Sequence, residues 1–208
     1  MASQIALPLM LSGSAEAIVG GASLQGAFAG LMVSETWPYR TAVLSGPPRS
    51  GKSLLARWFA ASGQGEAIDD ADRVDETALF HDWNRAQAAG RALLLVAREP
   101  VATGGANAGW RIALPDLASR LGAALPLVIA PPDDDLLAAL IGEHARRRAL
   151  ALPDAVRDWL VPRIERSHAA AEQVVAALDR LSLERKAPVT LGLARDVITA
   201  AHWQPRLL

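Results

Sequence analysis

The chain has 208 residues, of which 51% are hydrophobic and 21% charged, enough to bury a sizeable core in one large domain or in one domain with a small second one. Its formal net charge of −1 excludes an overall basic surface for nucleic acid, and no run reaches the roughly 18 apolar residues that cross a bilayer. It contains no cysteine, which excludes disulfides and thiolate sites and suits the reducing cytoplasm.

The first apolar stretch is QIALPL, residues 4–9. A secretion signal is excluded, because no basic residues precede the run, and a proline and a Ser-Gly-Ser sequence interrupt it. Two alternatives remain: a strand packed on the chain's own domain, or an extended peptide that docks into another protein. In a docked peptide, Leu7 and Leu9 would be apolar anchors, and the Gln4 amide would donate and accept hydrogen bonds.

Strands and helices are predicted to alternate from residue 41 to residue 130. Residues 41–46 (TAVLSG), 91–97 (RALLLVA) and 125–130 (LPLVIA) are apolar runs of strand length, and residues 66–70 (EAIDD) form a poorer strand. The first run is followed directly by a helix with an apolar face, and the EAIDD run by a helix that starts near Asp75. This order predicts a parallel sheet covered by helices on both faces.

After Pro131 and Pro132 the pattern is helical throughout. Helix starts are indicated at residues 133–135 (three aspartates), 153–154 (Pro-Asp), 167 (serine) and 190 (threonine), which are residue types that begin helices. We therefore expect an N-terminal peptide (residues 1–15), an α/β nucleotide-binding domain (16–132) and a small helical domain (133–208).

The strongest motif is GPPRSGKS, residues 46–53, which matches the phosphate-binding loop pattern and lies between a predicted strand and helix. Backbone N–H groups and the helix dipole would hold a phosphate chain, Lys52 would reach the outer phosphates, and Ser53 would bind Mg²⁺. A chance glycine-rich turn is the alternative. The predicted nucleotide-binding residues of this loop are Gly46, Pro47, Pro48, Arg49, Ser50, Gly51, Lys52 and Ser53.

Two further positions carry charges that phosphoryl transfer uses. Asp69 would complete the Mg²⁺ site and Asp70 would orient an attacking water, although such a pair can also be a solvated turn. Arg120, near the end of a predicted short helix, could stabilise a transferring phosphoryl group on a neighbouring molecule, or could form a surface ion pair. The four histidines have no ligand spacing, so we expect no metal besides magnesium.

Together, IVGGAS, GPPRSGKS, IDDAD, LFHDWN, LPDLASRL and RIERS resemble the ATPase module of the AAA+ family to which the bacterial replication initiator DnaA belongs. With QIALPL in front, the chain is most similar to Hda-like regulators, which join a sliding-clamp-binding peptide to that module. The resemblance covers nearly the whole chain and implies an AAA+ domain with a helical lid. The chain ends after the lid, so we expect no dedicated DNA-binding domain.

The resemblance also implies roles for individual residues. Gln4, Leu7 and Leu9 would contact the clamp, Val19 and Gly20 would lie near the adenine of ADP or ATP, and Arg120 of the SRL motif would be an arginine finger that projects outward to DnaA. The implied function is a clamp-bound regulator that promotes ATP hydrolysis on DnaA and so restrains replication initiation. The implied partners are the clamp and DnaA, with a homo-oligomer considered and no membrane.

Three departures from the family pattern matter. The segment between Lys52 and Asp69 is short, which predicts a sheet reduced by one strand. The first sensor position falls at or near Ala97 and the second near Ala169, where no arginine stands, although Arg166 lies one turn earlier. These changes predict weak ATP hydrolysis by the chain itself. They keep open a nucleotide-stabilised interaction module, and, as a further alternative, a self-sufficient P-loop ATPase or small-molecule kinase.

Overall fold

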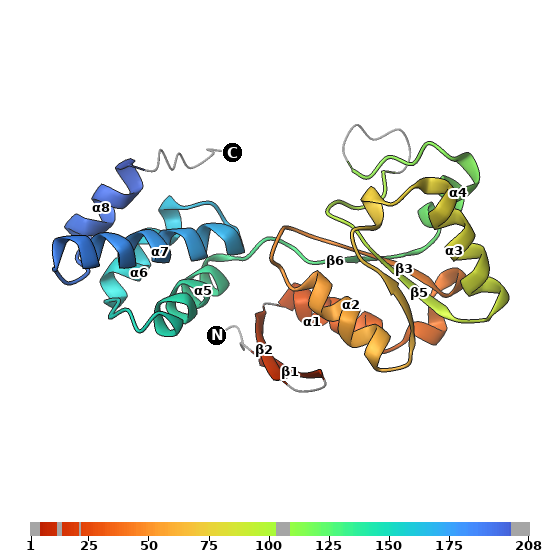
Figure 1. Ribbon diagram of the computed structural model, residues 1–208, viewed down its shortest axis with the longest axis horizontal. Helices are drawn as coiled ribbons and strands as arrows, with labels where there is room; N and C mark the ends of the chain where they lie inside the picture. Colours follow the sequence, from red (N-terminus) through yellow and green to blue (C-terminus); the bar gives the residue numbers. More distant parts are fainter. Residues whose placement is uncertain (1–4, 12–13, 21, 103–108, 201–208) are drawn as a thin grey trace. The chain divides into compact units, whose positions relative to one another are not determined.

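The computed structural model describes residues 5–11, 14–20, 22–102 and 109–200, with side chains from residue 24 onward. The chain divides into two compact units, an α/β unit of residues 6–130 and a helical unit that contains the chain from Pro131 onward (Figure 1). No described helix is both long and apolar enough to cross a membrane.

The α/β unit contains a parallel sheet whose described strands follow the order β4-β5-β3-β6. These strands are β3 (Thr41–Ser45), β4 (Gly65–Ile68), β5 (Ala92–Val96) and β6 (Leu125–Val128). The central strand β3 pairs with β5 and with β6, so Val43 lies opposite Leu95 and Pro126. The expected parallel sheet is confirmed. Along the described chain, the segment between α2 and Asp69 contains the strand β4 and no further helix or strand, as its short length predicts.

Helices cover both faces of this sheet (Figure 1). In the described part of the unit they are α1 (Ala22–Leu31), α2 (Lys52–Ala61), α3 (Glu76–Ala88) and α4 (Pro115–Gly122). Side chains of a strand alternate between the two faces. Leu44 and Leu94 accordingly belong to one buried core with α1 and α2, while Val43 and Leu95 belong to the other with α3 and α4. The continuous apolar runs of the sequence reflect this burial on both sides.

Two strands precede α1 and form a separate two-stranded sheet, β1 (Ile5–Leu11) and β2 (Ser14–Gly20). Residues 5–9 of QIALPL therefore lie in a strand that pairs within the chain. Helix α1 was not predicted from the sequence, since the amino-acid pattern before residue 34 carries no clear period.

The helical unit consists, in its described part, of α5 (Asp134–Arg147), α6 (Asp154–Leu160), α7 (His168–Arg185) and α8 (Leu191–Ala200). The predicted helix starts are confirmed. The side chains of Asp133 and Ser167 cap α5 and α7 by accepting from the backbone N–H groups of Leu136 and Ala170. Apolar residues of α5 and α7, among them Leu137 and Val174, are fully buried in this unit.

Candidate nucleotide site

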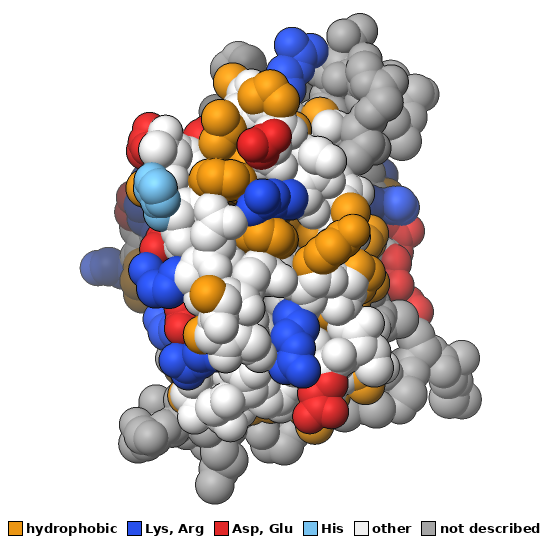
Figure 2. Space-filling model, turned by 90° about the vertical axis from the view of Figure 1, so that its right-hand side faces the viewer, with side chains coloured by type: hydrophobic (Ala, Val, Ile, Leu, Met, Phe, Trp, Pro, Cys, Tyr) orange, Lys and Arg blue, Asp and Glu red, His pale blue; other side chains and the backbone are white. Residues whose placement is uncertain are grey.

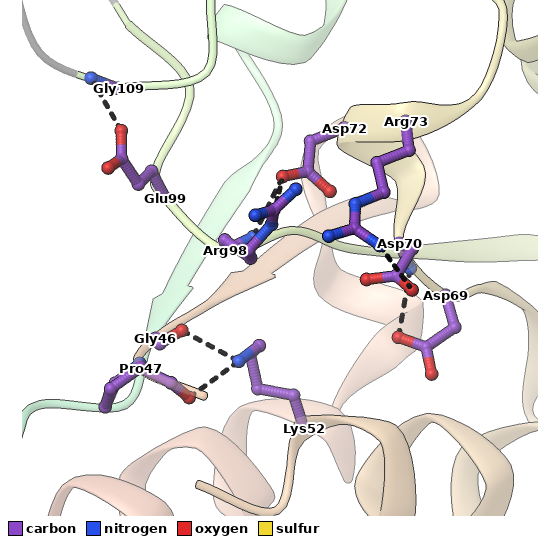
Figure 3. Close-up of polar contacts among 10 residues, drawn as sticks. All are labelled: Gly46, Pro47, Lys52, Asp69, Asp70, Asp72, Arg73, Arg98, Glu99 and Gly109. Carbon is purple, nitrogen blue, oxygen red and sulfur yellow. Dashed lines mark hydrogen bonds and ion pairs between the residues drawn. The ribbon is translucent and has the colours of Figure 1, made fainter. Parts of the chain in front are cut away.

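The loop GPPRSGKS leaves the carboxyl end of β3 and enters α2 directly (Figure 3). A Cβ atom at Gly46 would come within 2.7 Å of the Ile129 carbonyl oxygen, so only glycine fits at this position. Gly51, with φ of 93°, turns the chain into the helix in a left-handed conformation that glycine adopts without strain. Both glycines of the motif therefore have a structural reason in this fold.

The N-terminus of α2 has the features of an anion site. No side chain caps it within the described structure, whereas the side chains of Asp75, Asp133 and Ser167 cap α3, α5 and α7. The first N–H groups of a helix have no partner inside the helix. The Ser50 hydroxyl beside them is buried and has no hydrogen-bond partner in the described structure, so its polar atom fits a bound phosphate.

Lys52, the first residue of α2, is 9% exposed. Its Nζ donates to the carbonyl oxygens of Gly46 and Pro47 at 2.7 and 2.8 Å (Figure 3). Burial lowers the pKa of Lys52 below its ordinary value, while the carboxylates of Asp69, Asp70 and Asp72 act in the opposite direction. The amine is thus held inside the loop. A buried ammonium is costly without a partner of opposite charge, and a bound phosphate would be that partner.

Asp69 and Asp70 follow the carboxyl end of β4, and both are exposed. The Asp70 N–H donates to Asp69 Oδ1 at 3.0 Å, and Asp70 Oδ2 lies 4.0 Å from Arg73 Nη1. Because β4, β5 and β3 run parallel in one sheet, these carboxylates lie at the same edge of the sheet as the loop (Figure 3). Ser53, the other predicted Mg²⁺ ligand, is exposed in the first turn of α2.

Within the described residues, no group of three or more His, Asp or Glu side chains could by itself hold a metal ion. Mg²⁺ keeps several waters and is bound through one or two carboxylates plus substrate phosphates. Asp69 and Ser53 fit that mode. Bound there with a nucleotide, Mg²⁺ would neutralise phosphate charge.

Sequence reasoning missed two charged residues at this edge, Asp72 and Arg98. Arg98 lies two residues after β5, between the loop and the carboxylates that follow β4 (Figure 3). Asp72 Oδ2 is 3.4 Å from Arg98 Nε, and Asp72 Oδ1 is buried without a hydrogen-bond partner in the described structure. Ala97, at or near the predicted first sensor position, is 1% exposed and offers no polar group. Arg98 could have been found by the rule that locates Asp69: it follows a buried strand at its carboxyl end.

Arg120 lies near the end of α4. The resemblance implies that its side chain projects outward, whereas in the structure the side chain folds back onto α3. Its guanidinium stacks over the rings of Phe80 and Trp83, with its carbon 4.5 and 4.3 Å from their centroids. Its Nη1 also donates to Asn84 Oδ1 at 2.6 Å. The side chain folds back onto α3 because two aromatic faces and one amide attract the cation more than water does at a half-buried position. We call Phe80, Trp83 and Asn84 the Arg120 cradle.

The Arg120 cradle lies at the edge of the sheet opposite to the loop. Trp83 Nε1 donates to the Thr41 hydroxyl at 3.1 Å, and Thr41 begins β3, whereas Gly46 follows its end. Five strand residues separate these two edges by roughly 16 Å. Arg120 is therefore out of reach of a nucleotide in its own loop.

Comparisons with known proteins agree with this fold. Domain III of the Thermotoga maritima replication initiation protein DnaA is 16% identical, with a TM-score of 0.66 over 90% of this chain and 95% of that chain. The Thermotoga maritima RuvB Holliday junction branch migration motor is 17% identical, with a TM-score of 0.58 over 86% and 66% of the two chains. DnaA bound to AMPPCP and single-stranded DNA is 16% identical, with a TM-score of 0.55 over 78% and 62%.

The helical unit also matches a known protein family. Residues 133–198 match the family model described as the lid domain of Hda. The chain is thus similar to Hda in its helical unit and to domain III of DnaA in its fold. The AAA+ fold with a helical lid, expected from the sequence motifs, is thereby confirmed.

The remaining predicted site residues lie elsewhere in the chain. Arg166 belongs to the helical unit, where its Nη2 is 2.8 Å from Asp134 Oδ1, and its role toward nucleotide stays a prediction. Val19 and Gly20 lie in β2, and Leu7 and Leu9 in β1. Gln4 lies outside the described residues.

Proposed function

We propose that this Hda-like protein is a cytoplasmic, sliding-clamp-bound regulator that promotes hydrolysis of ATP on the initiator DnaA and so restrains replication initiation. The observation that carries the proposal is the position of Arg120. A half-buried cation at the edge of the sheet away from its own loop can serve a nucleotide only on another molecule. The lid match and the DnaA-like fold support DnaA as that molecule.

In this proposal the chain's own nucleotide site is mainly structural. ADP or ATP with Mg²⁺ would be held by the loop residues 46–53, by Asp69 and by Asp70. Hydrolysis there would be slow, because Ala97 offers no polar group at the first sensor position. The bound nucleotide would stabilise the α/β unit by mass action and keep the surface that meets DnaA in one conformation.

The surface around α3 and α4 is the proposed contact with DnaA. Figure 2 shows the face of the α/β unit at the end where these helices lie in Figure 1, and basic and hydrophobic side chains are interspersed on it. Such a mixture suits a transient interface, because transient interfaces are no more apolar than the rest of a protein surface.

The N-terminal residues would supply the clamp contact. Strand β1 pairs with β2 in a sheet of two described strands, and an extended segment of this kind can add to the edge of a partner through its backbone while alternate side chains enter pockets. Gln4, Leu7 and Leu9 are the proposed contacts.

A clamp-binding measurement tests this part of the proposal. Double substitution Leu7→Ala, Leu9→Ala should weaken binding to purified clamp at least about 30-fold, since each truncated hot-spot anchor costs about 2 kcal/mol. The melting temperature should stay unchanged. A large fall in melting temperature with intact clamp binding would instead identify β1 as a strand needed only by this chain's own fold.

A further inference from the structure

Helix α4, which carries Arg120, is short and has eight residues. Helices of fewer than about 12 residues are marginal by themselves, so the position of α4 depends on its contacts with the rest of the α/β unit. Leu117 and Leu121 are buried in the core that α4 shares with α3. Apolar burial has no preferred direction and leaves the helix able to shift along α3. The position of Arg120 therefore depends on the polar contacts of α4.

One of these polar contacts lies at the start of α4. The carboxylate of Glu76, the first residue of α3, accepts from the Ala113 N–H through Oε1 at 2.9 Å and from the Leu114 N–H through Oε2 at 2.7 Å. Each carboxylate oxygen thus binds one of two consecutive backbone N–H groups directly before the helix. Hydrogen bonds to a carboxylate are stronger than neutral ones, and they require a defined angle. Glu76 therefore fixes the segment that enters α4.

Glu76 and the Arg120 cradle lie on one face of α3. The three cradle residues follow Glu76 by four, seven and eight positions, which is the spacing of a single helix face. Glu76 holds the start of α4, and the cradle holds Arg120 near its end. The two contacts lie roughly 12 Å apart along α3, since a helix rises 1.5 Å per residue. With both contacts in place, α4 cannot slide along α3 without breaking a hydrogen bond.

We propose that Glu76 is a positioning residue, which fixes α4 on α3 so that Arg120 is presented to the partner's nucleotide in one place. This inference rests on the proposed function, in which Arg120 acts on ATP bound to another molecule. Glu76 acts through α4 and not by contact with nucleotide. Displacement of a catalytic group by about 1 Å can lower a rate roughly 100-fold, so a small shift of α4 is enough to impair stimulation.

Glu76→Gln tests this role with little change of shape, and Asp75→Asn is its matched control. The glutamine amide keeps one acceptor oxygen and turns an NH₂ donor toward the second backbone N–H, so one of the two hydrogen bonds is lost. Asp75 caps α3 by accepting from the Ala78 N–H at 3.0 Å. Asparagine is an equally good cap, so Asp75→Asn removes the same charge at the same helix start and leaves the bonds of Glu76 in place.

The first measurement is the rate of ATP hydrolysis on purified DnaA with DNA-loaded clamp, as a function of the concentration of each variant. Glu76→Gln should lower the maximal rate at least about tenfold and change the half-saturating concentration less than about threefold. A variant that is only less stable would instead reach the wild-type maximal rate at higher concentration, because only its folded fraction is reduced. Asp75→Asn should match wild type in both quantities.

The second measurement follows α4 directly. The chain contains no cysteine, so spin labels can be attached through Ser119→Cys on α4 and Ala61→Cys at the end of α2, both exposed positions. Pulsed electron paramagnetic resonance on the full chain then gives the distribution of distances between the labels. Glu76→Gln should shift or broaden this distribution, and Asp75→Asn should leave it as in wild type. Should Glu76→Gln not fold, Glu76→Asp, which is shorter by one methylene, takes its place with the same expected results.

Several results would overturn the inference. A maximal rate of Glu76→Gln equal to that of wild type would do so and would leave the proposed function standing. An unchanged distance distribution, or a rate that recovers at higher concentration, would make Glu76 a structural residue only. An equal loss of maximal rate in Asp75→Asn would assign the effect to charge. If wild type does not stimulate hydrolysis on DnaA, the proposed function fails and this inference with it.

Discussion

Substitution of Lys52 by alanine should separate nucleotide binding from folding. The substitution removes an amine that donates to the Gly46 and Pro47 carbonyls. A charge-assisted hydrogen bond to phosphate contributes about 1.5–3 kcal/mol, so the affinity for ADP and ATP should fall roughly 10- to 100-fold. The fold should change little, because the lost hydrogen bonds are offset by removal of a charge whose lowered pKa reports costly burial.

The size of the effect follows from mass action. At a nucleotide concentration about 100 times the wild-type Kd, binding stabilises the protein by about 2.7 kcal/mol, and a 100-fold weaker Kd reduces this to about 0.4 kcal/mol. With roughly 2–4 °C per kcal/mol for a protein of this size, nucleotide should raise the melting temperature of wild type by about 5–10 °C. The variant should gain about 1–2 °C if its affinity is 100-fold weaker, and about 3–6 °C if it is 10-fold weaker.

Calorimetric titration and thermal unfolding with and without nucleotide measure these quantities. The matched control is the other lysine of the chain, Lys186, which ends α7 with φ of 49°. Lys186→Asn suits that left-handed conformation and removes the same charge in the helical unit. Equal affinities in wild type and Lys52→Ala would refute the phosphate role of the loop, and so would a loss of affinity in Lys186→Asn as large as in Lys52→Ala.

Two further substitutions test the Arg120 cradle and the helical unit. Asn84→Ala removes the 2.6 Å acceptor of Arg120 Nη1 and should reduce stimulation of DnaA several-fold in a hydrolysis assay, without loss of clamp binding; full stimulation would mean that the cradle does not position Arg120. Hydrogen bonds from Arg146 and Arg147 hold the pKa of the Glu143 carboxyl below its ordinary value. The ionised carboxylate therefore contributes to folding stability at neutral pH, and this contribution is lost as pH falls through the lowered pKa. Glu143→Gln should accordingly lower stability at pH 7 by less than about 1 kcal/mol and make no difference once the carboxyl is protonated, which chemical denaturation at the two pH values measures; an equal loss at both would contradict this.

The fold was predictable wherever burial left a period in the sequence. The strands β3 and β5 are apolar runs because they are covered on both faces. In the helical unit, α5, α7 and α8 begin at the capping side chains of Asp133, Ser167 and Thr190. Helix α1 could not be predicted, because its sequence ASLQGAFAGL contains small residues and two glycines, which leave no amphipathic pattern.

The candidate site was predictable as far as its motif extends. The residues 46–53 and Asp69 are named by spacing alone, and the structure brings them to one edge of the sheet. Arg98 could have been placed at this edge from its position after a buried strand, but its ion pair with Asp72 depends on the order of the strands, which no local pattern encodes. The folded-back position of Arg120 depends on a contact with residues 36 positions away, and Phe80 and Trp83 look like ordinary core residues until that contact is known.

The decisive measurement is the rate at which ATP on purified DnaA is hydrolysed in the presence of DNA-loaded clamp and this protein, with Arg120→Ala as the variant. Wild type should accelerate hydrolysis, whereas Arg120→Ala should abolish the acceleration while it binds the clamp, and its own nucleotide, as tightly as wild type. This separation follows from the location of Arg120 at the far edge of the sheet from its own loop. Stimulation by Arg120→Ala equal to that by wild type, or no stimulation by wild type at all, would contradict the proposed function.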